Sequence, residues 1–225
     1  MANLEMQQEK IFLVSFHKSA SSSMHEFFIQ HGLTSCHCPV KVNGVNYAKL
    51  VSGIPDSPGE IVEAFAPVIN SFQAHCDIPW GGLVPELLAC YPNSRFIFVK
   101  REPNGWWESL KGHWRLDICG RYLSIFEYIQ YRRYISGARV RLFTRKDKQL
   151  FLDAFKRHEQ LVAEVVPKSQ LLVVDIEDKN KSRIIADFLG LREAGVFPHV
   201  VPISQRRQHR RVFGILCRRL FKIMV

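Results

Sequence analysis

A lysine followed by four serines lies in one short loop near the start of the chain. An apolar run, residues 11–15, precedes this loop, and apolar residues at helical spacing follow it from Met24. A strand–loop–helix unit of this kind directs free backbone N–H groups and the positive end of the helix dipole at an anion. Hydroxyl groups and an ammonium group add further donors. The residues that we expect to bind the anion are Lys18, Ser19, Ala20, Ser21, Ser22 and Ser23.

A second candidate for anion binding is Arg101, which directly follows the clearest strand pattern of the sequence, residues 95–100. Arginine forms paired hydrogen bonds to phosphate, and Ser109, two helical turns further on, can add another. An arginine after a strand is by itself more often an ion-pair partner. Its assignment as a ligand therefore depends on its combination with the serine-rich loop, and the two together predict a ligand with two anionic groups.

The order of residues in the loop disfavours an ordinary kinase or GTPase. Those enzymes use Gly-x-x-x-x-Gly-Lys-Ser/Thr, which is absent, and here the lysine precedes the hydroxyl cluster. A divergent nucleotide or small-molecule kinase stays open as an alternative that would require ATP and Mg²⁺. The plainest structural alternative for this segment is a capped helix start with a surface lysine.

The elements that must position these residues alternate along the chain. Short runs at residues 11–15, 95–100 and 171–175 predict buried strands, and residues 71–76 are a further possible strand. Helical patterns separate them at residues 24–31, 60–72, 83–91, 103–114, 121–136, 147–166 and 182–189. We expect residues 34–58 to form loops and Pro67 to kink or divide its helix. The alternation predicts a three-layer α/β/α fold with a central parallel sheet. Without a linker, residues 1–225 are expected to form a single domain.

The formal net charge of +10 is concentrated in two places. Residues 95–146 contain twelve basic and four acidic residues, and residues 206–225 contain seven basic residues and no acidic one. Such surfaces suit a nucleotide, an acidic substrate or an anionic membrane. The C-terminal segment 206–225 has three open interpretations: a basic loop over a phosphate, an amphipathic helix on a membrane, or a last helix packed on the domain. No nucleic-acid-binding motif is present, so no nucleic-acid partner is expected.

Composition also limits the protein class. The polar first ten residues do not resemble a secretory signal, and no apolar stretch is long enough to span a membrane. The six cysteines are scattered rather than arranged as a disulfide framework. Cys36-His37-Cys38 has no second Cys/His pair at zinc spacing. We therefore expect a cytoplasmic protein with free thiols and no metal, in peripheral membrane contact at most through residues 206–225.

Several segments resemble one enzyme family. Residues 10–24, Lys-Ile-Phe-Leu-Val-Ser-Phe-His-Lys-Ser-Ala-Ser-Ser-Ser-Met, are similar to the 5′-phosphosulfate loop of PAPS-dependent sulfotransferases of the P-loop-like superfamily. Arg101 with Ser109 resembles their 3′-phosphate motif. Further segments resemble the compact microbial branch of these enzymes and occur in its order: Asp77-Ile-Pro79, 86–92, 171–175, 188–190 and 197–200. The resemblance covers residues 10–200.

This resemblance implies a P-loop NTPase-like sulfotransferase fold and an activity. A sulfuryl group would move in line from PAPS (3′-phosphoadenosine-5′-phosphosulfate) to a hydroxyl or amine of a small-molecule or glycan acceptor. Lys18 would neutralise charge on the bridging oxygen, and residues 19–23 would hold the 5′-phosphate. Arg101 and Ser109 would hold the 3′-phosphate, and no metal would be needed.

The chain departs from the family at three positions. Ala20 stands where the loop has glycine, and Glu102 replaces the usual aspartate after the motif arginine. Val201 follows Phe-Pro-His-Val where the branch tends to have asparagine. Ala20 and the basic tail keep open a second class of function, a non-catalytic nucleotide-binding scaffold of the same fold.

Transfer to a hydroxyl needs a base, for which the candidates are Asp77, His75, His113 and His17. Asp77 follows a predicted strand and matches the branch's Asp-x-Pro pattern, so it is favoured, with a loop-bracing carboxylate as the alternative. His75 would share the face of Asp77 in an extended segment. The predicted catalytic residues are thus Lys18, Asp77 and His75.

Other aromatic residues and histidines are better explained by structure. His158 lies in the middle of a predicted helix and is expected to be structural. Trp106, Trp107 and Trp114 could stack on adenine, but at helical spacing we expect them in the core.

Overall fold

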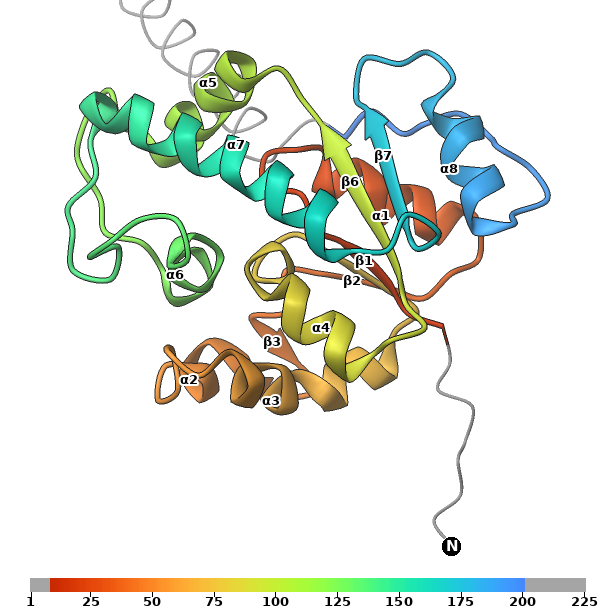
Figure 1. Cartoon of the computed structure of the whole chain (residues 1–225), viewed down its shortest axis with the longest axis horizontal. Helices are drawn as coiled ribbons and strands as arrows, with labels where there is room; N and C mark the ends of the chain where they lie inside the picture. The colour runs from red at the N-terminus through yellow and green to blue at the C-terminus, as the bar shows by residue number, and fades with distance from the viewer. Residues whose placement is uncertain (1–8, 201–225) are drawn as a thin grey trace, which may run out of the picture.

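The computed structural model describes residues 9–200. Five parallel strands form a central sheet in the order β2-β5-β1-β6-β7 (Figure 1). The strands are β1 (Ile11–Leu13), β2 (Ser35–His37), β5 (Ala74–Cys76), β6 (Arg95–Lys100) and β7 (Leu171–Asp175). The sequence predicted four of these strands, all except β2, and apolar runs of the kind that buried parallel strands show indicated β1, β6 and β7.

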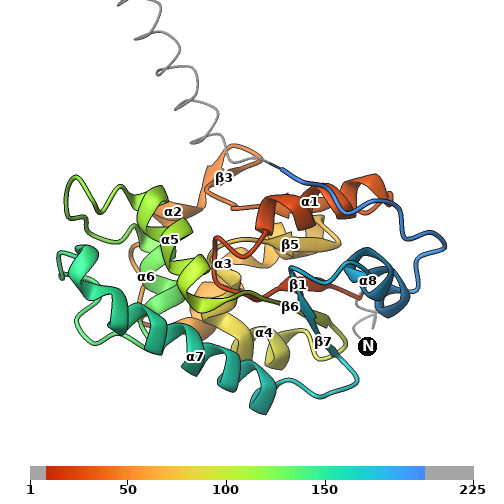
Figure 2. The same ribbon diagram turned by 90° about the horizontal axis from the view of Figure 1, so that it is seen from above.

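Helices cover both faces of this sheet (Figure 2). On one face, α1 (Ser21–Gln30) and α8 (Lys181–Leu189) pack on the odd-numbered residues of β1. On the other, α3 (Pro58–Ser71), α4 (Val84–Cys90) and α7 (Lys148–Val165) pack on its even-numbered residues. Successive side chains of a strand point to opposite faces, so β1 supplies both cores. The predicted three-layer α/β/α arrangement is confirmed.

A third apolar cluster extends beyond the sheet. It joins α7 to α5 (Pro103–Trp114) and α6 (Ile125–Tyr131) through aromatic side chains. Trp106, Trp107 and Trp114 are all buried in it, so the prediction that they belong to the core is confirmed. This cluster supports the side of the molecule on which the candidate site lies.

The region 34–58 is more ordered than predicted. It contains the edge strand β2, the two-stranded hairpin of β3 (Lys41–Val42) and β4 (Val45–Asn46), and the short helix α2 (Tyr47–Val51). The sequence hid β2 because an edge strand of three residues, Ser-Cys-His, has no apolar run. Its pairing with β5 defines it.

Two predicted helices also differ. Pro67 lies inside α3, which continues without a break. Pro67 is exposed, so a carbonyl that loses its helical donor there faces water. The helix predicted over 121–136 is limited to α6, which begins at a capping box of Ser124 and Glu127. Two 3₁₀ turns, η1 (Trp80–Leu83) and η2 (Arg145–Asp147), complete the elements.

Two findings bear on the predicted class of protein. Within residues 9–200, no helix has the length and apolarity needed to cross a membrane. The cysteines of the same range are free thiols, as predicted: Cys36, Cys38, Cys76, Cys90 and Cys119. Cys217 and the basic segment 206–225 lie outside the described residues.

Candidate active site

The loop between β1 and α1 lies at the carboxyl edge of the sheet. Two of its residues have left-handed backbone conformations, Lys18 with φ 71° and Ala20 with φ 62°. Ala20 is the N-cap of α1, and no side chain caps this helix end. The first N–H groups of α1 therefore stay available for an anion. Ser19 Oγ is buried without a hydrogen-bond partner among the described residues.

Residues of β6 and α5 hold this loop in place. Arg101 Nη1 donates to the carbonyl oxygen of Lys18 at 2.5 Å, and Trp106 Nε1 donates to the carbonyl oxygen of His17 at 3.0 Å. In addition, the backbone N–H of Val99 in β6 donates to Ser15 Oγ, just after β1, at 2.6 Å. Arg101 and the serine-rich loop, which the sequence predicted to form one anion site together, are thus in direct contact.

The helix α5 begins directly after Arg101 and has its own cap. Glu102 accepts hydrogen bonds from the backbone N–H groups of Asn104 and Gly105 at 2.9 and 2.5 Å, and these bonds lower the pKa of its carboxyl. Glutamate can therefore perform the helix-capping role at a position where the family has aspartate. Ser109 lies two turns further along α5 and is half-buried.

Lys18 is half-buried beside other charges. Burial lowers the pKa of its ammonium, Arg101 lowers it further, and Asp77 raises it. Lys18 and Asp77 therefore lie close enough to interact, although Lys18 follows β1 and Asp77 follows β5. The two favoured catalytic candidates therefore lie at the same edge of the sheet, because β1 and β5 are parallel neighbours.

Asp77 directly follows β5 and has a left-handed backbone, φ 72°. Its side chain is 16% exposed, and Oδ2 lies 3.6 Å from His37 Nε2. Oδ1 is buried without a partner among the described residues. A carboxylate oxygen that lacks a donor is unfavourable when buried, so Oδ1 is suited to receive a proton or hydrogen bond from a bound group.

Sequence reasoning missed His37 as a site residue. His37 Nε2 lies 3.3 and 3.4 Å from Ser21 Oγ and Ser22 Oγ, in addition to its contact with Asp77. It links the start of α1 to Asp77 because β2, the strand that ends in it, pairs with β5. The only sequence signal was Cys36-His37-Cys38, and residues 9–200 contain no cluster of three or more metal-binding side chains.

The structure corrects the assignment of His75. It is fully buried, its ring stacks on Phe12 with centroids 5.0 Å apart, and Trp80 packs against it at 5.2 Å. Burial lowers the pKa of His75 to about 3. A general base must touch the acceptor, so His75 is a core residue. The alternation that we expected to continue to Asp77 fails because Asp77 leaves the extended conformation.

The other histidines occupy different positions. His158 is buried in α7 and its ring nitrogens contact the carbonyl oxygen of Val14 and Tyr134 Oη at 2.6 and 2.9 Å. Its structural role is as predicted. His113 is exposed at the end of α5, and its ring lies 6.2 Å from that of His17. His113 therefore lies beside the part of the loop that contains His17.

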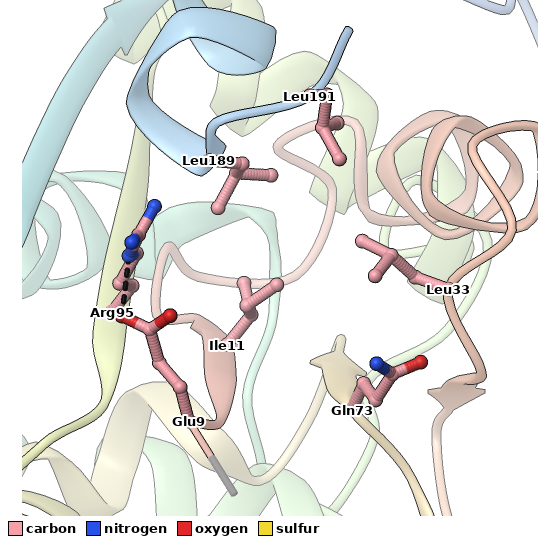
Figure 3. Close-up of a pocket in the computed structure, with 7 residues that line it drawn as sticks. All are labelled: Glu9, Ile11, Leu33, Gln73, Arg95, Leu189 and Leu191. Atoms are coloured by element: carbon pink, nitrogen blue, oxygen red, sulfur yellow. Dashed lines mark hydrogen bonds and ion pairs between the residues drawn. The ribbon is translucent and has the colours of Figure 1, made fainter.

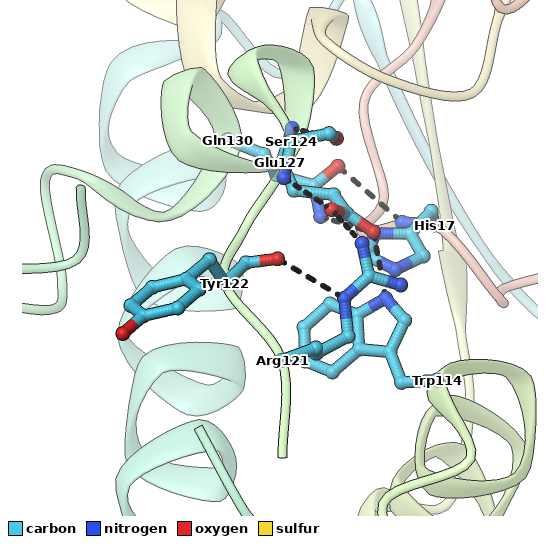
Figure 4. Close-up of polar contacts among 7 residues, drawn as sticks. All are labelled: His17, Trp114, Arg121, Tyr122, Ser124, Glu127 and Gln130. Atoms are coloured by element: carbon cyan, nitrogen blue, oxygen red, sulfur yellow. Dashed lines mark hydrogen bonds and ion pairs between the residues drawn. The ribbon is translucent and has the colours of Figure 1, made fainter. Parts of the chain in front are cut away.

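A buried polar network supports His17 from α6 (Figure 4). Gln130 contacts the ring nitrogen Nδ1 of His17 at 2.7 Å, and Glu127 accepts from Trp114 Nε1 and Arg121 Nη2, both at 2.6 Å. Glu127 and His17 also interact electrostatically, which lowers the pKa of Glu127 despite its burial. Residues of the basic region 95–146 thus reach the serine-rich loop.

The last described segment returns to the same loop. The backbone N–H of Val200 donates to Ser23 Oγ at 3.3 Å, and the ring of Phe197 lies 5.8 Å from that of Phe27 on α1. Figure 2 shows this segment passing over α1.

A cavity of about 200 Å³ lies elsewhere (Figure 3). Ile11 and Arg95, the first residues of β1 and β6, line it, together with Glu9, Gln73 and three leucines. It therefore lies at the amino ends of the strands, opposite the loop.

A family model described as "Sulfotransferase domain" matches residues 10–201. The chain belongs to this sulfotransferase family. Among solved structures, this sulfotransferase domain is similar to a sulfotransferase from Alicyclobacillus acidocaldarius, with a TM-score of 0.52 and 16% identity over 92% of this chain and 90% of the other. At that identity the likeness concerns the fold. No curated protein matches the sequence. The resemblance read from the sequence is thereby confirmed.

Proposed function

We propose that this sulfotransferase uses PAPS as its donor and transfers the sulfuryl group to a hydroxyl or amine of a small-molecule or glycan acceptor. The observation that carries the proposal is the hydrogen bond from Arg101 to the carbonyl of Lys18. It joins the two motifs that would bind the two phosphates of one nucleotide. Family membership supports sulfuryl transfer, and this paired arrangement supports the donor.

The residues of the loop fit the 5′ end of such a donor. The uncapped N-terminus of α1 supplies backbone donors, and the buried Ser19 Oγ lacks a partner among the described residues. The hydroxyls of residues 21–23 can add hydrogen bonds to the 5′-phosphate. Lys18 would neutralise the charge that develops on the bridging oxygen as the sulfur–oxygen bond breaks. Arg101 and Ser109 would bind the 3′-phosphate.

We propose Asp77 as the general base. Its Oδ1 has no partner among the described residues, and Lys18 lies near enough to influence it electrostatically. The acceptor's proton would pass to Oδ1 while Oδ2 stays oriented toward His37. No metal takes part in this scheme.

Calorimetry with 3′,5′-adenosine bisphosphate tests the donor. We expect binding at micromolar concentration, and Lys18→Ala should retain binding but lose sulfuryl transfer from PAPS across a panel of acceptors. Lys168→Ala is the matched control, because Lys168 precedes β7 and therefore lies at the opposite edge of the sheet. Absence of binding at high micromolar nucleotide would contradict the proposal.

The same experiment separates the alternatives. Binding without sulfated product in the wild-type protein would indicate a non-catalytic scaffold, the alternative that Ala20 keeps open. Binding of ATP that depends on Mg²⁺, in place of adenosine bisphosphate binding, would indicate a divergent kinase. The cytoplasmic location and peripheral membrane contact expected from the sequence stay predictions, which fractionation of cells expressing the whole chain would test.

A further inference from the structure

His17 holds a buried polar atom that the proposed chemistry does not use. The residue is 4% exposed, and Nε2 has no hydrogen-bond partner among the described residues. Gln130 binds the opposite side of the residue twice: Gln130 Oε1 accepts from the backbone N–H of His17 at 3.4 Å, and Gln130 Nε2 lies 2.7 Å from His17 Nδ1.

These two contacts favour one tautomer of the ring. Since Gln130 Oε1 accepts from the backbone, the amide nitrogen is the donor to Nδ1. An Nδ1 that accepts a hydrogen bond carries no proton, so the proton of the neutral ring is on Nε2. Burial lowers the pKa of His17 to about 4, so the ring is neutral near pH 7. His17 is therefore a donor at Nε2 and is no longer a candidate for the base.

The surroundings of His17 distinguish it from the two other buried histidines. The ring nitrogens of His75 also lack partners among the described residues, but this ring lies in the core between Phe12 and Trp80. Both ring nitrogens of His158 have partners. His17 instead lies in the loop itself, directly before Lys18, and interacts electrostatically with Glu127, Asp77, His113 and Lys18. The exposed ring of His113 is 6.2 Å from it. The unpartnered Nε2–H thus belongs to a residue of the candidate loop that directly precedes the proposed catalytic lysine.

We propose that His17 is a further catalytic residue whose Nε2–H donates a hydrogen bond to a non-bridging oxygen of the sulfuryl group during transfer. This rests on the proposed function. The bond from the acceptor oxygen or nitrogen to sulfur forms while the bond from sulfur to the 5′-phosphate oxygen breaks. The acceptor proton goes to Asp77, and the leaving phosphate oxygen beside Lys18 keeps the electron pair. The sulfuryl group passes between Lys18 and Asp77. His17 orients the group there and reduces the repulsion between its negatively charged oxygens and the nucleophile.

Nuclear magnetic resonance of the wild-type chain, with ¹⁵N-labelled histidine, tests this without a variant. We expect His17 to show a protonated Nε2 and a bare Nδ1 from pH 6 to pH 8. Adding 3′,5′-adenosine bisphosphate with inorganic sulfate, which together mimic the two halves of the donor, should shift the Hε2 resonance downfield. A proton on Nδ1, or an Hε2 resonance unmoved by saturating amounts of both probes, would overturn the role of His17.

Variants test the same role in the reaction. His17→Phe should lower kcat for sulfuryl transfer about 10- to 100-fold, with the Kd of adenosine bisphosphate changed less than about 3-fold. His17→Gln, which keeps an N–H donor, should recover most of the rate. His31→Phe is the control, because His31 caps the far end of α1. Equal losses in His17→Phe and His17→Gln would contradict the donor role.

The two proposals fail in different ways. Wild-type protein that neither binds adenosine bisphosphate nor transfers a sulfuryl group would overturn the proposed function. Full activity in His17→Phe, with the nucleotide bound normally, would overturn the role of His17 and leave the proposed function standing.

Discussion

Arg101 donates a hydrogen bond to the backbone carbonyl of Lys18, so the conformation of the lysine depends on the arginine. The contact spans 83 positions of the sequence and orients two cations toward one edge of the sheet. Lys18 has a left-handed backbone, a conformation that costs about 1 kcal/mol or more for a residue other than glycine. A charge-assisted hydrogen bond of about 1.5–3 kcal/mol can offset that cost.

Removal of this contact should affect both binding and stability. In Arg101→Met the apolar stem is retained and the guanidinium is lost, so we expect the Kd of adenosine bisphosphate to rise at least about 10-fold and the free energy of unfolding to fall by about 1–2 kcal/mol. Calorimetry and urea denaturation measure the two effects. Arg183→Met, on the exposed surface of α8, is the control. An unchanged Kd would mean that Arg101 only braces the loop.

Ala20 should gain stability on replacement by glycine. Its φ of 62° is unfavourable for alanine and free of strain for glycine. We expect Ala20→Gly to raise the free energy of unfolding by about 0.5–1 kcal/mol, and to tighten nucleotide binding if the missing Cβ lets the ligand approach. Ala163→Gly, at an exposed position inside α7, should lower stability by about 1 kcal/mol. Destabilisation by both changes would show that the loop does not adopt this conformation.

Asp77→Asn tests the base without changing the shape of the side chain. We expect kcat for transfer to a hydroxyl to fall about 100-fold or more, while adenosine bisphosphate binds with a Kd within about 3-fold of the wild type. Asp153→Asn, at an exposed position of α7, should leave both kcat and Kd unchanged. Full activity of Asp77→Asn would remove it as the base and favour a loop-bracing role.

The buried histidines should make the protein sensitive to acid. Burial lowers the pKa of His75 to about 3 and those of His17 and His158 to about 4, against 6.5 in an unfolded chain. Between these values the unfolded state binds more protons than the folded state, so stability rises with pH from about 4 to 6.5 and falls as pH decreases through that range. Each of these three histidines should lower the free energy of unfolding by about 1–2 kcal/mol between pH 7 and pH 5.

Denaturant unfolding at pH 7, 6 and 5 measures this slope. His75→Phe should reduce the loss of stability between pH 7 and pH 5 by about a third, since it removes one of three such groups from an aromatic environment that tolerates a ring. A wild-type stability that does not depend on pH in this range would contradict the burial of these groups as neutral rings.

The layers of the fold were predictable because apolar runs and the helical spacing of apolar residues both reflect which side chains are buried. Residues 95–100 and 171–175 were predicted as strands and are β6 and β7. The edge strand β2 was not predictable, because three residues of mixed polarity become a strand only through pairing with β5. His37, at the end of β2, was missed for that reason.

The sequence by itself determined the strand–loop–helix unit, the pairing of a lysine-before-serine loop with Arg101, and thereby the family. These depend on local order and residue type, which remain visible in a linear chain. The tertiary structure decided which candidates meet. It placed His75 in the core, joined His37 to Asp77, and brought Gln130 against the ring of His17. Those outcomes depend on contacts between distant segments, whose burial and hydrogen bonding no spacing in the sequence encodes.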